Sequence, residues 1–89
     1  MDVSEYISET GERMDVKGSL YASFFHPHLN LSAEELLRNH KIAQKFKTEE
    51  NSVELSEDEY NILRTIFISI RGFDINDVEL VRRVLEWHT

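Results

Sequence analysis

Three short stretches of this chain share one pattern: an apolar residue, Ser or Asn, two variable residues, Glu, and another apolar residue. They are LSAEEL at residues 31–36, LSEDEY at 55–60 and INDVEL at 75–80. The first amides of an α-helix have no acceptor within the helix, so an N-cap Ser or Asn side chain accepts from one of them, and a Glu three residues on accepts from the N-cap amide. The pattern therefore predicts helix starts at Ser32, Ser56 and Asn76, which commits most of the chain to a helical fold.

The same segments could instead be a carboxylate site used three times. Their spacings of 24 and 20 residues are unequal, which argues against a solenoid of equivalent repeats. Glu in the first turn also suits the positive end of the helix dipole. The flanking apolar residues form candidate hydrophobic staples, which pair Leu31 with Leu36, Leu55 with Tyr60, and Ile75 with Leu80. We therefore assign the three segments to folding and not to binding.

Apolar residues follow each predicted cap at helical spacing. After Ser32 they are Ala33, Leu36, Leu37, His40, Ala43 and Phe46. After Ser56 they are Tyr60, Ile62, Leu63, Ile66, Phe67 and Ile70. After Asn76 they form two stripes, one of Val78, Val81 and Leu85 and one of Leu80, Val84 and Trp87. These patterns predict helices over residues 33–47, over 57–71 with Gly72 as the stop, and from 77 to near the chain end.

The first thirty residues carry a turn signal and one further helical pattern. Thr10-Gly11 separates two stretches with β-branched and aromatic residues, which favours a short hairpin. GSLYASFF then predicts a short helix that Pro27 closes. We therefore expect a single domain, 1–89, of mainly α class: three to four short helices in a compact bundle with a small N-terminal β-hairpin or extended arm. Residues 1–17 form the hairpin or arm, and residues 18–89 are helical.

Composition excludes several classes of function. The chain has no Cys, which removes disulfides and thiolate chemistry. No stretch approaches the roughly 20 apolar residues of a membrane span, and MDVSEYISETGER has neither a basic leader nor an apolar signal core. A net charge of −7 would repel a phosphate backbone. We therefore expect a soluble protein with no membrane partner and no direct nucleic-acid binding.

The last two predicted helices, joined by RGFDI, have the order of a helix-turn-helix. A recognition helix presents basic or amide side chains near its start, but this one begins Asn76, Asp77, Val78, Glu79. Its acidic first turn does not suit DNA. The basic residues Arg38, Lys41 and Lys45 are interpreted as a solvated outer face of their helix.

Candidate catalytic and metal-binding residues are few. His26 and His28 are two apart, and they would need His40 or His88 and a carboxylate to complete a metal site. Their spacing across Pro27 is not a zinc signature, and His40 falls in an apolar stripe, as a core histidine does. Gly-rich phosphate loops and Gly-x-Ser-x-Gly are missing. We expect no metal, no cofactor and no enzymatic activity.

Most of the chain resembles small uncharacterised proteins encoded in bacteriophages and prophages. The elements that carry the resemblance are the N-terminal arm, the helix ending LLRNHKIAQKF, the segment NSVELSEDEYNIL, and a last apolar helix ending VLEW. The resemblance implies a cytoplasmic setting in a bacterial host cell. It carries over no functional residues.

Two hypotheses for function follow. The first is a protein-interaction module, a small phage-type accessory protein that binds a host or phage protein as an inhibitor, adaptor or assembly factor. The second is an acidic decoy, in which residues 49–59 and the acidic residues of 2–15 occupy a nucleic-acid-binding groove on a target. A decoy needs a regular acidic face, whereas an adaptor needs an exposed apolar patch. We favour the adaptor, because the apolar surplus is visible in the sequence.

That surplus predicts an interface. Ile68 points away from the main stripe of its helix, and Leu80, Val84 and Trp87 lie off the Val78 stripe. Trp often anchors interfaces, and two-fold dimers are the commonest closed assembly. We therefore predict a homodimer, or a partner-binding surface, that contains Ile68, Leu80, Val84 and Trp87.

Overall fold

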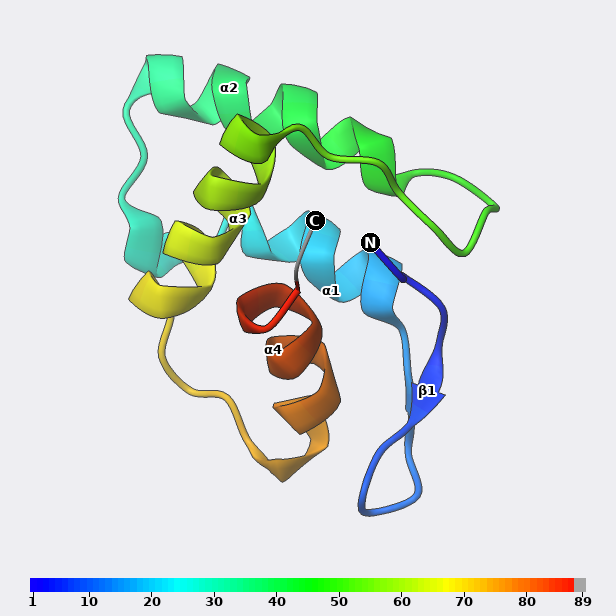
Figure 1. The fold of residues 1–89 in the computed structure, drawn as a ribbon. Helices are drawn as coiled ribbons and strands as arrows, with labels where there is room; N and C mark the ends of the chain where they lie inside the picture. Colours follow the sequence, from blue (N-terminus) through cyan, green and yellow to red (C-terminus); the bar gives the residue numbers. More distant parts are fainter. Residues whose placement is uncertain (88–89) are drawn as a thin grey trace.

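The computed structural model describes residues 1–87 of the chain, and these residues form a mainly α fold (Figure 1). Its four α-helices and two strands are β1 (Tyr6–Ile7), β2 (Arg13–Met14), α1 (Val16–Ser23), α2 (Ala33–Ala43), α3 (Glu57–Ser69) and α4 (Val78–Leu85). Three single 3-10 turns join them: η1 (Pro27–Leu29), η2 (Gln44–Phe46) and η3 (Ile75–Asp77). The predicted fold class is confirmed within this range, hairpin included.

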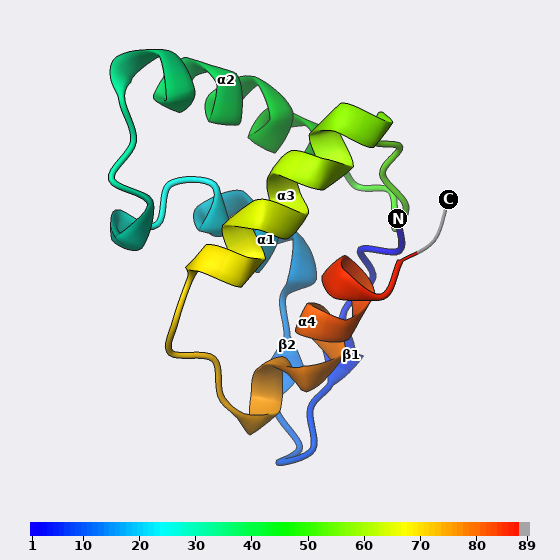
Figure 2. The ribbon, with the colours of Figure 1, turned by 60° about the vertical axis from the view of Figure 1, so that its left-hand side comes forward.

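The helices enclose one hydrophobic core. α2 lies at one end of the molecule and the hairpin at the other, with α1, α3 and α4 between them (Figures 1 and 2). All four helices contribute buried side chains, chiefly Leu20 of α1, Ile42 of α2, Leu63 and Ile66 of α3, and Leu80 and Val84 of α4, and Phe24, at the C-cap of α1, is buried with them. Residues 1–3 run beside residues 51–53, where the Val3 amide donates to Asn51 and the Val53 amide to Met1, each at 2.9 Å.

Two of the three predicted capping boxes are confirmed. The Ser32 hydroxyl accepts from the Glu35 amide at 3.2 Å, and the Glu35 carboxylate accepts from the Ser32 amide at 3.1 Å. The Ser56 and Glu59 pair does the same at 3.2 and 2.9 Å. α2 and α3 therefore begin where the sequence predicts. α3 ends at Ser69, two residues earlier than predicted, because Ile70 adopts an extended conformation.

The third predicted cap is wrong. Asp74, not Asn76, forms the box, since its side chain accepts from the Asn76 amide at 2.8 Å while Asp77 accepts from the Asp74 amide at 3.0 Å. The Asn76 side chain instead contacts Thr10 and Glu12 of the hairpin. Asp74 and Asn76 are both suitable N-cap residues. Asp74 caps the turn η3 in the structure, and the Asn76 side chain is then free to contact the hairpin.

The helical region also begins earlier than residue 18. The Asp15 side chain accepts from the Gly18 amide at 3.1 Å, so α1 starts at Val16. The preceding hairpin closes at Gly11, whose φ of +87° suits glycine. It pairs Tyr6 with Met14 and Ile7 with Arg13.

Tyr6 attaches this hairpin to the start of α4. Its hydroxyl donates to the Asn76 carbonyl at 2.8 Å and accepts from the Leu80 amide at 3.3 Å. The Arg83 guanidinium lies 5.3 Å from the centre of the Tyr6 ring and donates to the Ser4 carbonyl at 2.8 Å. Burial raises the pKa of the Tyr6 hydroxyl above 10.0. The N-terminal hairpin is therefore packed against the helical part of the fold.

Candidate functional site

The predicted interface residues do not share one surface. Val84 is 0% exposed and Leu80 is 4% exposed, so both belong to the core and the prediction that they form an interface is wrong. α4 carries two apolar stripes, and the Leu80 stripe, not the Val78 stripe, packs inward. Trp87 is half-buried with its ring 4.8 Å from that of Tyr60, while Ile68 is 60% exposed.

The α2 face was predicted correctly at Ala43 and Phe46 but wrongly in the earlier turns of the helix. Its buried residues are Asn39, Ile42 and Ala43, followed by Phe46 in η2. Leu36 is exposed, Leu37 is 71% exposed, and His40 is exposed and contacts Gln44 at 2.9 Å. Figure 2 shows that the first turns of α2 stand away from α3.

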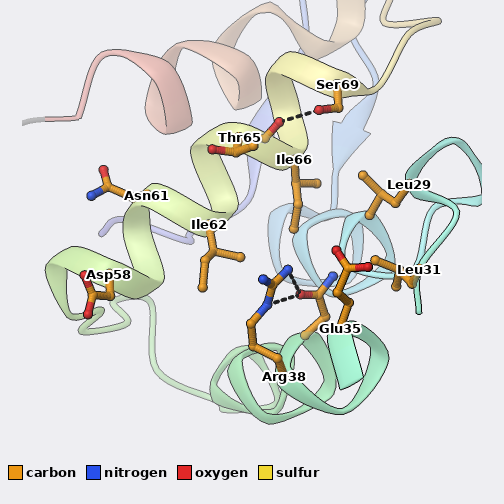
Figure 3. Close-up of a pocket in the computed structure, with 11 residues that line it drawn as sticks. Leu29, Leu31, Glu35, Arg38, Asp58, Asn61, Ile62, Thr65, Ile66 and Ser69 are labelled. Carbon is orange, nitrogen blue, oxygen red and sulfur yellow. Dashed lines mark hydrogen bonds between the residues drawn. The ribbon is translucent and has the colours of Figure 1, made fainter. Parts of the chain in front are cut away.

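This divergence leaves an open groove of about 620 Å³ between α2 and α3, which we call the α2–α3 groove (Figure 3). Its apolar lining consists of Leu29, Leu31, Ile62 and Ile66. Its polar lining consists of Glu35, Arg38 and Asn39 from α2 and Asp58, Asn61, Thr65 and Ser69 from α3. The α3 residues recur every three or four positions, which places them along one side of the helix. Ile68 follows Thr65 by three, so it lies beside this rim.

The exposed side chain of Arg38, which lines the groove, is oriented by a neighbouring amide. Its Nε–H and Nη2–H donate to the side-chain oxygen of Asn39 at 3.1 and 3.0 Å (Figure 3). The Asn39 side chain is 0% exposed and donates in turn to the Phe24 carbonyl at 2.8 Å. Arg38 is therefore oriented by a buried amide that is itself anchored to the end of α1.

Two carboxylates share the groove with Arg38. The Ser32 backbone amide, and then the Ser32 side chain, hold the pKa of Glu35 below its usual 4.5, with a smaller contribution from Arg38. Asp58 lies in the first turn of α3. In the view of Figure 3, Arg38 is drawn between Glu35 and Asp58. The lining of the groove thus includes one positive group and two negative ones.

The other two basic residues of this helix region lie elsewhere. The Lys45 ammonium pairs with the Glu59 carboxylate at 2.6 Å, and Lys41 is exposed. Arg38, Lys41 and Lys45 are all exposed, which agrees with their interpretation as a solvated face, but Arg38 also lines the groove and Lys45 is paired. Asn39 was the available signal, since it is a polar residue at helical spacing from Ile42, Ala43 and Phe46.

The two neighbouring histidines act as acceptors for backbone amides. The His28 amide donates to Nδ1 of His26 at 3.1 Å, and the Arg71 amide donates to Nδ1 of His28 at 3.4 Å. Within residues 1–87 there is no group of three or more His, Asp or Glu side chains placed to hold a metal ion. His88 lies outside the described residues. Among the helices described, none has the length and apolar character needed to cross a membrane.

A second apolar hollow, of about 350 Å³, lies along α4. Phe73, Val78, Val81 and Leu85 line it, so the Val78 stripe of α4 is only partly buried. Its basic residue, Arg82, already pairs with Glu79 at 3.5 Å and with Glu86 at 3.7 Å. The α2–α3 groove is larger and holds an arginine outside any ion pair of the described residues, so we take it as the candidate site.

Comparisons with protein-family models, with curated proteins and with solved structures gave no match to this chain.

Proposed function

We propose that this protein is a non-enzymatic protein-interaction module whose partner binds in the α2–α3 groove. The observation that carries the proposal is an open groove lined by four aliphatic side chains, Leu29, Leu31, Ile62 and Ile66, together with polar ones. Binding surfaces of proteins combine an apolar centre with a polar rim in this way. In keeping with the resemblance to phage-encoded proteins, the module would act as an inhibitor, adaptor or assembly factor in the cytoplasm of a bacterial host.

The apolar surface continues beyond the groove. Leu31 also lines a neighbouring hollow, together with Phe25, Pro27 and the exposed Leu36. A partner seated in the groove can therefore bury additional apolar surface at its edge. The free energy available scales at roughly 25 cal/mol for each Å² of apolar surface removed from water.

The acidic decoy is the weaker alternative. Several of the carboxylates it requires already serve the fold: Asp15 caps α1, Glu5 lies 3.5 Å from Arg13, and Glu59 both caps α3 and pairs with Lys45. Carboxylates that cap helices or pair with basic side chains are not available to mimic the regularly spaced phosphates of a nucleic acid.

Capture from a bacterial lysate with matched variants tests the proposal. Asn61→Arg places a long charged side chain on the groove rim, and Asn51→Arg makes the same change at an exposed loop position. We expect Asn61→Arg to abolish capture of a specific protein and Asn51→Arg to retain it, with both variants keeping the wild-type melting temperature. Capture that both variants retain would contradict binding in the groove.

A further inference from the structure

The shape of the groove walls restricts what kind of segment can bind there. Most of the lining comes from the helices α2 and α3, whose backbone amides and carbonyls are already paired along the helix axis, so an added β-strand would find no sheet edge there. An amphipathic helix needs only apolar and polar side chains to contact, and it commonly binds between two other helices. The open angle between α2 and α3 (Figure 2) and the aliphatic lining of the groove suit such a helix.

The positive charge of Arg38 in the groove lining restricts the sequence of that helix. A guanidinium has five N–H donors, and two of those of Arg38 are taken by the Asn39 oxygen. In the part of the chain that the structure describes, the other three meet no protein acceptor, and no carboxylate lies within ion-pair distance. A carboxylate can accept two of these N–H groups together, which is the geometry in which arginine binds it best.

The buried amide behind Arg38 makes this arrangement effective. A long side chain with no hydrogen-bond partner loses conformational freedom when it binds, and that loss reduces affinity. Here Asn39, fixed to the Phe24 carbonyl, already orients the guanidinium. The site thus holds its cation ready for an incoming anion.

The flanking carboxylates add a second requirement. Glu35 and Asp58 line the same groove as Arg38, and they would repel a helix that carried only acidic residues. A helix with one carboxylate opposite Arg38 and basic residues to either side would complement all three charges.

We propose that the α2–α3 groove binds an amphipathic helix of a partner protein through one Asp or Glu that pairs with Arg38, with basic residues flanking it. This inference rests on the proposed function and specifies the chemistry of the partner. It assigns Arg38 the role of anchor and Asn39 the role of positioning residue.

A selection experiment supplies the probe. A library of helical peptides of about 14 residues, or roughly four turns, is displayed and selected on the whole folded chain. We expect the selected peptides to carry Asp or Glu on the apolar face, with Lys or Arg in the adjoining turns. The best peptide should bind at least about fivefold more tightly than its version with Gln in place of the acidic residue.

Protein variants then assign the preference to Arg38. Arg38→Gln should erase the difference between the acidic and the Gln peptide, while Arg64→Gln, at an exposed position of α3 outside the groove lining, should leave it intact. Asn61→Arg should abolish binding of both peptides.

Two results would overturn the inference in different ways. Peptides that need Asn61 but show no preference for an acidic residue would remove the role of Arg38, and the groove would remain as a docking site. A selection that yields no binder, or only binders indifferent to Asn61→Arg, would exclude the helix itself. In either case, lysate capture that depends on Asn61 would leave the proposed function standing.

Discussion

Asn39 of α2 donates its side-chain amide to the backbone carbonyl of Phe24, at the end of α1, with a distance of 2.8 Å. Both groups are inside the core, where Asn39 is 0% exposed. This hydrogen bond joins α2 to the end of α1. Nearby, the ring of Phe24 lies 5.9 Å from the ring of Phe46 in η2.

Asn39→Ala should lower the free energy of unfolding by about 2 kcal/mol, because the Phe24 carbonyl would stay buried without its donor. Urea denaturation measures this loss. Asn61→Ala, at an exposed position of α3, is the control and should change stability by less than about 0.5 kcal/mol. Equal losses of stability in the two variants would show that the Asn39 hydrogen bond does not stabilise the fold.

Ser56→Ala should cost about 1 kcal/mol of stability by removing the N-cap hydrogen bond to the Glu59 amide. It should leave partner capture unchanged, because Ser56 does not line the α2–α3 groove. Ser52→Ala, at an exposed loop position, controls for the loss of a hydroxyl. An unchanged melting temperature together with lost capture would mean that Ser56 belongs to a binding site.

Glu59 should make stability depend on pH. Burial acts to raise the pKa of Glu59, but the hydrogen bonds from Lys45 at 2.6 Å and from the Ser56 amide at 2.9 Å outweigh it and hold the pKa below 4.5. Because the folded pKa lies below the unfolded one, the stabilisation is complete above the unfolded value and is lost as pH falls through the folded value.

Urea denaturation at several pH values tests this dependence. The stability difference between wild type and Glu59→Gln should be largest near neutral pH and should shrink below pH 4.5. Glu54→Gln, at an exposed position, should show a smaller change. A difference that stays constant down to acidic pH would contradict the role of the ionised carboxylate.

The features that could be predicted from the sequence are local ones. Ser32 and Ser56 cap their helices through residues three positions away, so the pattern alone identifies them. The choice between Asp74 and Asn76 was not local, because Asn76 contacts the hairpin some 66 positions away at Thr10. The burial of Val84 was not local either, since α4 has apolar residues on two sides and its packing against α3 decides between them.

The candidate site was the least predictable part. The groove exists because α2 and α3 diverge, and no pattern within either helix encodes that angle. Arg38 is a surface residue, as the sequence predicts, and its orientation comes from its hydrogen bonds to the buried Asn39, which no sequence pattern shows.

Self-association is tested by sedimentation equilibrium at micromolar concentration. Two of the four residues predicted to form the homodimer surface, Leu80 and Val84, are buried in the core, and Trp87 packs on Tyr60. We therefore expect a species of 10.5 kDa at every concentration. A larger mass that rises with concentration, and that Ile68→Ser abolishes, would restore the homodimer predicted from the sequence.

Photocrosslinking in a bacterial lysate tests the central claim, that a partner protein occupies the α2–α3 groove. A short diazirine-bearing amino acid replaces Asn61 on the groove rim in one variant and Asn51, an exposed loop residue, in the other. We expect position 61 to crosslink to one protein, within a helical segment that contains an acidic residue, and we expect position 51 not to crosslink to that protein. The same crosslinked proteins from both positions, or none from position 61, would contradict it.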